Sequence, residues 1–197
     1  SDGTLICLTP GESISMKDSN NTRPSKGWIL AFHPDLICGT ALGANIRDYT
    51  FFSYRPEEAL HISLREKQVI LELLDKINQE LQRCIDCYSQ KIISKYIELL
   101  LDYCERFYER QFITRNEANK QIIGRFNRLL DHHFHTIQSQ SADLPTIEDC
   151  AGSLHLSPAY FNDLLEYETG KSFKEYLQFK RFETAKDWLI NTDKPLN

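Results

Sequence analysis

The spacing of apolar residues along the chain changes near residue 63. Before that point, three short runs rich in β-branched and aromatic residues, TLICLT, GWILAF and YTFFSY, are separated by the turn-forming stretches PGES, DSNNTRPSKG and PDLICGTALG. Such runs predict short β-strands. A sheet of so few strands has open edges, so we expect residues 1–60 to be the end of a larger β domain or to pair with another chain.

From Ser63 onward, apolar residues recur at the three- and four-residue intervals of α-helices. The pattern predicts two long antiparallel helices between residues 63 and 112, and a third helix from about Glu117 to Ile137. The polar segment QSQSAD then interrupts the pattern.

The second of these helices is apolar over more than one stripe. Leu99, Leu100 and Leu101 fall on different faces of it, which predicts neighbours on two sides. We expect one neighbour to be a second subunit, with Leu99 and Leu101 at the dimer interface. The alternative is that these stripes belong only to the intramolecular core.

Residues 145–169 carry the start and stop signals of two short helices. Thr146 is followed three residues later by Asp149, close to a capping box, and Ser157 precedes a proline that fits the first helical position. A turn is predicted between the two helices at His155-Leu156. Small and apolar residues are expected to lock them at a steep angle, namely Ala151, Leu154, Leu156, Phe161 and Leu164.

Gly170 ends the second of these helices, and Ser172 with Glu175 forms a full capping box for a last helix to about Asn191. The predicted fold is therefore mainly α with a small N-terminal β portion. We expect three segments: a partial β region over 1–60, a helical hairpin over 61–113, and a helix-turn-helix unit with a long helix over 114–197.

Charge and composition narrow the function. The formal charge of −5 and the pI near 5.7 exclude a protein coated in basic residues, so any nucleic-acid binding must come from a local surface. No run approaches the length of a membrane span, and no signal peptide is recognisable at the N-terminus. We expect a cytoplasmic protein with reduced thiols, because the six cysteines are scattered through a mid-sized chain.

Two groups of residues have the composition of a metal or redox site. Cys84 and Cys87 form a single CxxC, which we interpret as two half-buried cysteines of a helix, with metal or redox chemistry as the alternative. His132, His133 and His135 lie near a helix C-terminus, where partly positive side chains are favourable. We interpret them as surface or capping residues, and expect no metal and no cofactor.

Residues 144–189 resemble the first half of the AraC/XylS-type DNA-binding domain. The residues that carry the resemblance are Ala151, Leu154, Leu156-Ser157-Pro158, Phe161, Leu164-Leu165, Glu168-Thr169-Gly170-Lys171-Ser172, Tyr176-Leu177, Arg181, Ala185 and Leu189. The upstream part is similar to regulators of this family whose N-terminal half ends in a cupin-like β domain followed by helices.

This resemblance implies an effector-responsive transcriptional regulator that forms a homodimer and binds double-stranded promoter or operator DNA. It also implies two helix-turn-helix units joined by a long helix. Residues 192–197 look like the lead-in to the second unit, so we expect the chain to be a fragment of a longer protein.

The chain departs from the family at the recognition helix. Positions that are often Arg or Lys in the family are Asp163, Glu166 and Tyr167 here, and residues 145–197 contain six basic and nine acidic side chains, a balance of −3. We therefore expect a weak attraction for phosphates. Base contacts are expected from Ala159, Tyr160, Asn162 and Asp163, and backbone contacts from Thr146, Ser157, Lys171, Ser172 and Lys174.

Two other functions remain as alternatives. The acidic recognition helix would also suit a helical interaction module that has lost DNA binding. An enzyme is not expected, because His33 and His61 have no HxH or carboxylate partner in the sequence, and no nucleophile elbow or phosphate loop is present.

Overall fold

A computed structural model describes residues 3–13, 27–137 and 144–191. It is mainly α-helical with one small two-stranded sheet, so the predicted fold class is confirmed. The chain divides into two compact units, residues 1–111 and 112–197. The boundary falls inside the long helix α4 (Ser89–Thr114).

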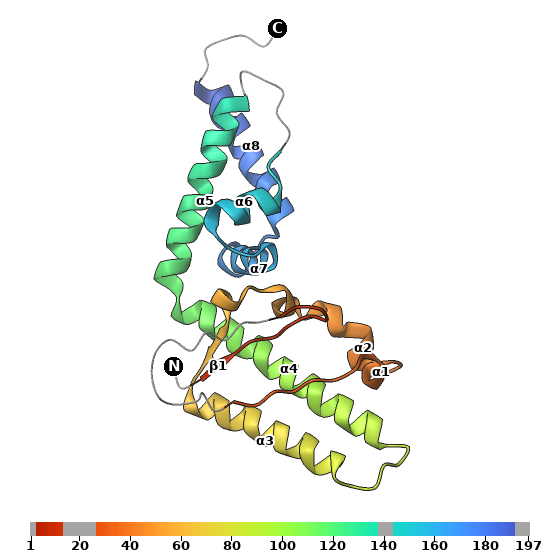
Figure 1. Ribbon diagram of the computed structural model, residues 1–197. Helices are drawn as coiled ribbons and strands as arrows, with labels where there is room; N and C mark the ends of the chain where they lie inside the picture. Colours follow the sequence, from red (N-terminus) through yellow and green to blue (C-terminus); the bar gives the residue numbers. More distant parts are fainter. Residues whose placement is uncertain (1–2, 14–26, 138–143, 192–197) are drawn as a thin grey trace. The chain divides into compact units, whose positions relative to one another are not determined.

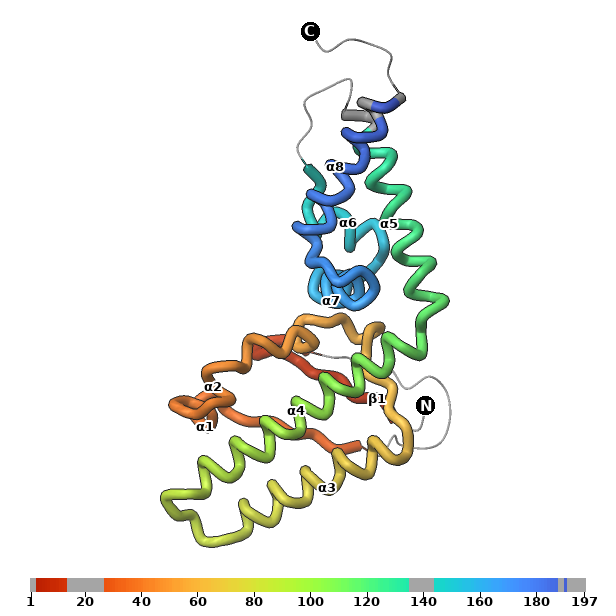
Figure 2. Tube along the Cα trace, turned by 180° about the vertical axis from the view of Figure 1, so that it is seen from behind, coloured from red at the N-terminus to blue at the C-terminus, as the bar shows by residue number. Residues whose placement is uncertain are grey.

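The first unit is built on an antiparallel pair of helices. Helix α3 (Leu64–Leu81) and helix α4 lie side by side, and residues 82–88 form the loop between them (Figures 1 and 2). A capping box starts α3: the Ser63 N–H donates to Glu66 Oε2 at 2.8 Å, and the Glu66 N–H points back to Ser63 Oγ at 3.4 Å. The helical hairpin predicted from the sequence is therefore present, with its first helix ending at Leu81.

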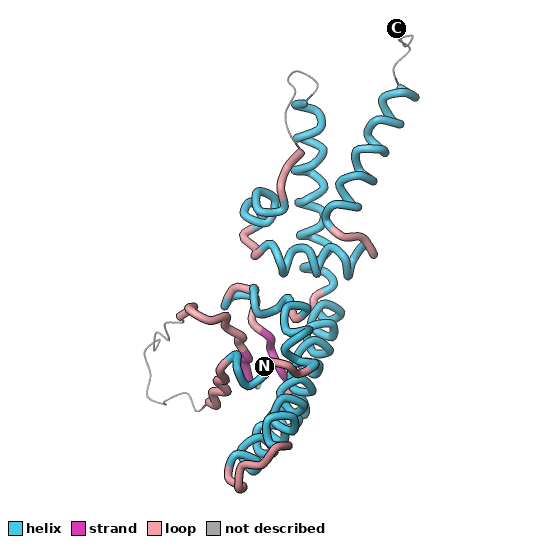
Figure 3. The backbone as a smooth tube through the Cα atoms, turned by 90° about the vertical axis from the view of Figure 1, so that its right-hand side faces the viewer, coloured by secondary structure: helices cyan, strands magenta, loops and turns pink. Residues whose placement is uncertain are grey.

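The segment that precedes the hairpin differs from its prediction. The expected strand in TLICLT shortens to β1 (Gly3–Leu5), which pairs antiparallel with β2 (Leu60–Ile62), as Figure 3 shows. GWILAF forms no regular element, and YTFFSY contains a 3₁₀ helix. The prediction of strands was wrong in both runs. In YTFFSY the Phe51 ring packs on a helix and stacks on Tyr108 of α4 with centroids 5.5 Å apart, and in GWILAF the Trp28 and Ile29 side chains are exposed.

Short helical elements occupy most of residues 34–58. They are α1 (Pro34–Ile37), α2 (Ala41–Asn45) and three 3₁₀ helices, Ile46–Asp48, Thr50–Ser53 and Pro56–Glu58. His33, considered above when an enzyme was weighed, caps α1 by accepting a hydrogen bond from the Asp35 N–H at 3.3 Å. These elements and the hairpin share one core, whose most buried members are Leu42, Leu60, Ile97 and Cys104.

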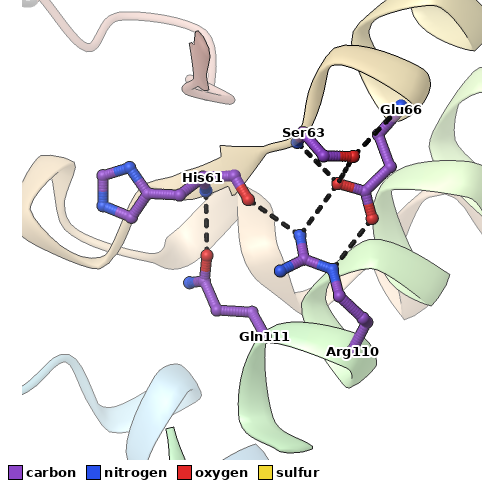
Figure 4. A network of polar contacts seen from close by, with 5 residues as sticks. All are labelled: His61, Ser63, Glu66, Arg110 and Gln111. Atoms are coloured by element: carbon purple, nitrogen blue, oxygen red, sulfur yellow. Dashed lines mark hydrogen bonds and ion pairs between the residues drawn. The ribbon is translucent and has the colours of Figure 1, made fainter. Parts of the chain in front are cut away.

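The open edge of β2 is closed by side chains of α4. The N–H of His61, the central residue of β2, donates to Gln111 Oε1 at 2.8 Å, and its carbonyl accepts from Arg110 at 2.8 Å (Figure 4). Arg110 also binds both carboxylate oxygens of Glu66, at 2.8 and 3.1 Å. One network therefore joins the sheet, the start of α3 and the end of α4.

The three consecutive leucines of α4 have different surroundings. Leu100 and Leu101 belong to the core of the first unit, and Leu101 is only 4% exposed. Leu99 is 43% exposed. The expectation that Leu101 lies at a dimer interface was wrong, because its face of α4 is filled by the chain's own core.

The cysteines of the CxxC are also placed differently from the prediction. Cys84 and Cys87 lie in the loop between α3 and α4, and both are exposed free thiols. The helix breaks there because Asp86 Oδ1 accepts hydrogen bonds from the N–H groups of Tyr88 and Ser89, at 2.8 and 3.1 Å, and so starts α4.

The second unit packs three helices against α5 (Asn116–Ile137). They are α6 (Ile147–Leu154), α7 (Pro158–Thr169) and α8 (Phe173–Asn191). Their core is aromatic at its centre, where the Phe126 ring of α5 meets Phe161 of α7 edge to face at 4.9 Å. The predicted boundaries of all four helices agree with the structure to within about one residue.

We expect the network at the end of α4 to make the first unit sensitive to acid. Burial disfavours the ionised form of Glu66, but hydrogen bonds from Ser63 and the Arg110 guanidinium outweigh it and hold the pKa of Glu66 below its usual value. Because the folded-state pKa lies below the unfolded-state value, the stabilisation is complete above the unfolded-state pKa. It is lost as the pH falls through the folded-state pKa.

The substitution Glu66→Gln should lower the free energy of unfolding at neutral pH by about 1–3 kcal/mol, since it removes a charged partner of Arg110. Urea unfolding at neutral pH and at pH near 3 would measure both effects, with a smaller difference between variant and wild type in acid. Glu72→Gln on the exposed side of α3 is the matched control and should change little. Equal losses in the two variants would contradict the assigned role of the network.

Candidate nucleic-acid interface

A tight turn joins α6 to α7. His155 follows the last residue of helix α6 and has left-handed backbone angles (φ 60°, ψ 36°). The Leu156 N–H then donates a hydrogen bond back to the Ala151 carbonyl at 2.9 Å. Ser157 starts α7 by accepting a hydrogen bond from the Tyr160 N–H at 3.3 Å. Two short helices joined by a capped turn of this kind form a helix-turn-helix, as the sequence predicts.

The two helices are held by a continuous apolar core. Ala151, Phe161, Leu164 and Leu165 are completely buried, and Leu154 is nearly so. All five come from the helix-turn-helix itself. Since one side of α7 is entirely used for packing, only its opposite side is available to a ligand.

The opposite side of α7 is a polar stripe. Ala159, Asn162, Asp163 and Glu166 follow the spacing i, i+3, i+4 and i+7, so they share one face, and each is at least partly exposed. Three of the four base-contact residues predicted from the sequence, Ala159, Asn162 and Asp163, lie on this stripe. Glu166 completes it.

The fourth predicted base-contact residue, Tyr160, is not on the stripe. Its side chain is 3% exposed, and its ring packs on Phe112 with centroids 5.4 Å apart. The expectation that Tyr160 touches a base was wrong, because Phe112 provides an aromatic partner within the same unit. Phe112 also stacks on Tyr167 at 5.6 Å.

Asn162 has a structural role in addition to its place on the stripe. Its Oδ1 accepts a hydrogen bond from the Phe173 N–H at 3.2 Å, which satisfies one of the free donors at the start of α8. Only its Nδ2 group can still donate to a base. An adenine contact that uses both amide atoms of Asn162 would therefore use the second lone pair of Oδ1, beside the hydrogen bond from Phe173.

At two of the helix starts that were predicted to bind phosphate, a carboxylate of the same helix is already hydrogen-bonded to the capping residue. Thr146 Oγ1 donates to Asp149 Oδ2 at 2.7 Å, and Ser172 Oγ donates to Glu175 Oε2 at 2.7 Å. The hydrogen bonds from Ser172 hold the pKa of Glu175 below its usual value, so the carboxylate is ionised at neutral pH. A phosphate at Ser172 would be repelled by Glu175, and a phosphate at Thr146 would lie beside the carboxylate of Asp149. Ser157 is itself buried, and its hydroxyl caps α7.

The cations of the unit lie outside the helix-turn-helix. Lys174 is exposed on α8, while the Lys171 ammonium lies 5.2 Å from the centre of the Phe179 ring. The sequence analysis missed Arg125 and Arg128 of α5, which are exposed and line a shallow hollow of about 540 Å³ together with Gln121 and Gly124. Their i, i+3 spacing was the available indication of a shared face.

Neither metal coordination nor membrane insertion is indicated by the described residues. No group of three or more His, Cys, Asp or Glu side chains within them is placed to hold a metal ion. Within the same ranges, no helix combines the length and the apolar character that crossing a bilayer requires. His61, which was weighed above as a possible enzyme residue, lies across the sheet from Thr4, and the distance from its Nδ1 to Thr4 Oγ1 is 3.4 Å.

Comparison with known proteins finds a regulator among the similar sequences. Over 91 residues the chain is 29% identical to the uncharacterized HTH-type transcriptional regulator YtdP of Bacillus subtilis (strain 168). The aligned part covers 45% of this chain and 12% of that protein, so the chain spans a small share of the relative's length. No family model and no solved structure matches the chain.

The glycine that ends α7 should matter more for stability than the glycine inside α6. Gly170 has φ 67° and open space around its Cα, so Gly170→Ala should cost about 1 kcal/mol of unfolding free energy through backbone strain alone. Gly152 has ordinary helical geometry and equally open space, so Gly152→Ala should raise stability by about 0.5–1 kcal/mol. Thermal unfolding of the two variants should move in opposite directions, and shifts of the same sign would refute the assigned turn geometry.

Proposed function

We propose that this chain is part of an AraC-type transcriptional regulator that binds specific double-stranded DNA through α7. The observation that carries the proposal is the polar stripe of α7, which is presented by a helix-turn-helix whose other side is fully packed. A recognition helix needs such a stripe, because base edges in the major groove are read by short polar side chains and small apolar groups. The similarity to a regulator named for its helix-turn-helix supports the same function.

Each residue of the stripe has a chemical role in this proposal. Asp163 accepts a hydrogen bond from the amino group of cytosine, Asn162 donates through Nδ2, and Ala159 contacts a thymine methyl group. Glu166 lies one turn further along and is the most exposed charge of the stripe. It opposes the approach of phosphates, which sets a limit on affinity.

The electrostatics of the helix-turn-helix require cations from elsewhere. Residues 146–170 contain five carboxylates and no Lys or Arg. Phosphate contacts dominate the affinity of DNA-binding proteins. We therefore assign the remaining attraction to exposed cations of the same unit, Lys174 first.

The proposal also includes an effector-responsive homodimer. The first unit would carry sensing and dimerisation, and two copies would present α7 to paired half-sites. Leu99 is an exposed apolar residue of α4 within the first unit, and it supports a dimer contact. Its neighbours one turn away on either side, Lys95 and Asp102, are exposed and charged, so we expect a contact with a polar rim.

Salt dependence of binding separates this function from the interaction module without DNA binding. The full-length protein should bind duplex DNA in a sequence-dependent way, and its affinity should fall as salt rises. Binding that does not depend on sequence, or no binding at low salt, would favour the interaction module.

Glu166→Lys should strengthen binding to all DNA sequences. The change replaces a repulsive charge on the α7 stripe by an attractive one, so the slope of log affinity against log salt should steepen by about one unit. Fluorescence anisotropy with cognate and scrambled duplexes at several salt concentrations measures this. Glu117→Lys on α5 is the matched control, since it changes the net charge equally away from the stripe. Equal effects of both variants would show that only net charge matters.

Leu99→Glu and Leu101→Glu should have different consequences. Leu99→Glu puts a charge into the proposed dimer contact, so the protein should become monomeric while its helix content stays the same. Leu101→Glu buries a charge in the core of the first unit and should destabilise it by about 3–5 kcal/mol. Sedimentation velocity and circular dichroism measure the two effects. A monomeric wild-type protein would contradict the dimer part of the proposal.

A further inference from the structure

Three of the six cysteines are exposed, and they lie near the start of α4. Cys38 is the residue that ends α1, while Cys84 and Cys87 lie in the loop that leads into α4. Cys38 is distant in sequence from Cys84 and Cys87. Its position in the fold therefore depends on the contacts that attach α1 to α4.

Polar side chains of α4 fix α1 in place. Gln90 Nε2 donates to the carbonyl oxygens of Asp35, Leu36 and Cys38 at 3.3, 3.1 and 3.3 Å. Ser94 Oγ donates to the Leu36 carbonyl at 3.1 Å. Figures 1 and 2, seen from opposite sides, both show α1 beside the first turns of α4. Since Gln90 bonds directly to the backbone of Cys38 and follows Cys87 by three residues, the two cysteines approach each other from separate segments.

Cys38 and Cys87 line the same hollow. The hollow has a volume of about 440 Å³ and is open to solvent, and its other lining residues include Gln90, Lys91 and Lys95. Among the described residues, Cys84 does not line it. Glu98 also lines the hollow and pairs with the Lys95 ammonium, so Lys91 supplies the positive charge beside the two thiols that attracts small molecules carrying carboxylates.

The three cysteines that are buried or half-buried, Cys7, Cys104 and Cys150, provide a contrast within the same protein. Burial raises the pKa of the Cys7 thiol to about 12 and that of Cys150 to about 11, and it raises the pKa of the fully buried Cys104 thiol further. Because the thiolate is the nucleophile in disulfide exchange, a raised pKa makes these three cysteines less reactive at neutral pH. Three cysteines are exposed, and of these Cys38 and Cys87 also line the same hollow, which distinguishes them as a pair.

We propose that Cys38 and Cys87 form a thiol–disulfide site that reacts with anionic low-molecular-weight disulfides of the glutathione class. One thiolate attacks the small disulfide, forms a mixed disulfide and releases one small thiol. The second cysteine then attacks the mixed disulfide and releases the other small thiol, taking its place in the bond. The protein loses two thiols and their two electrons, and the small disulfide is reduced to two thiols.

The bond would add a covalent link between two segments that hydrogen bonds and a shared apolar core now hold together. It would tie the end of α1 to the loop before α4 and close a covalent ring over residues 38–87. This ring contains the sheet strand β2 and the whole of α3. The site is independent of the DNA-binding proposal, because none of its residues belongs to the second unit.

Oxidised glutathione is the probe that tests the site. The folded chain is incubated with it at neutral pH, free thiols are then blocked, and the thiols are counted under denaturing conditions by mass spectrometry. Wild type and Cys84→Ser should each lose two thiols, so wild type falls from six free thiols to four, and peptide mapping should show a bond between Cys38 and Cys87. Cys38→Ser and Cys87→Ser should form no intramolecular bond, and a trapped glutathione adduct on the remaining cysteine supports the mixed-disulfide step.

Three outcomes would overturn the proposal. They are a Cys84–Cys87 bond as the main product in wild type, a bond between two chains instead of within one, and an unchanged thiol count in the folded protein. Each substitution replaces an exposed sulfur by oxygen, and circular dichroism before oxidation checks that all variants are folded. Added dithiothreitol should restore six thiols, which distinguishes a disulfide from irreversible oxidation.

Discussion

The first unit depends on the way α4 completes a sheet that is too small to stand alone. A two-stranded ribbon leaves the outward backbone groups of each strand without partners, and β2 is half-buried at His61 between the buried Leu60 and Ile62, where unpaired backbone groups are costly. Gln111 and Arg110 take the place of a third strand by bonding to the N–H and the carbonyl of His61. Because Arg110 also holds Glu66 at the start of α3, the closure of the sheet edge sets the position of the hairpin as well.

The second unit is organised by local backbone signals and not by charge. Thr146, Ser157 and Ser172 each cap a helix, and the left-handed residues His155 and Gly170 end two of them. These signals act within a few residues of one another, so they fix where each helix begins and ends without a contact from distant parts of the sequence. The aromatic contact between α5 and α7 then adds the packing that short helices cannot provide for themselves.

This difference explains which features could be predicted from the sequence. The helices of the second unit were predictable because capping residues and apolar spacing lie side by side in the chain. The strands in GWILAF and YTFFSY were not, because a run of aromatic residues does not reveal whether its partner is a strand or, as for Phe51, a helix residue 57 positions away. Tyr160 was misplaced for the same reason, since its partner Phe112 is distant in sequence. The start of α4 was marked by Asp86 and Ser89, a signal that the helical spacing of apolar residues concealed.

An acidic recognition stripe has a consequence for how specificity would arise. Attraction to phosphates is the same for every sequence, so a helix that lacks it gives little affinity to random DNA. Hydrogen bonds to base edges then form a larger share of the total interaction, and a mismatched base would lose the hydrogen bond proposed for Asp163. Such a helix would discriminate well and bind weakly. A protein that uses it for DNA recognition therefore needs either a second copy or a second reading unit.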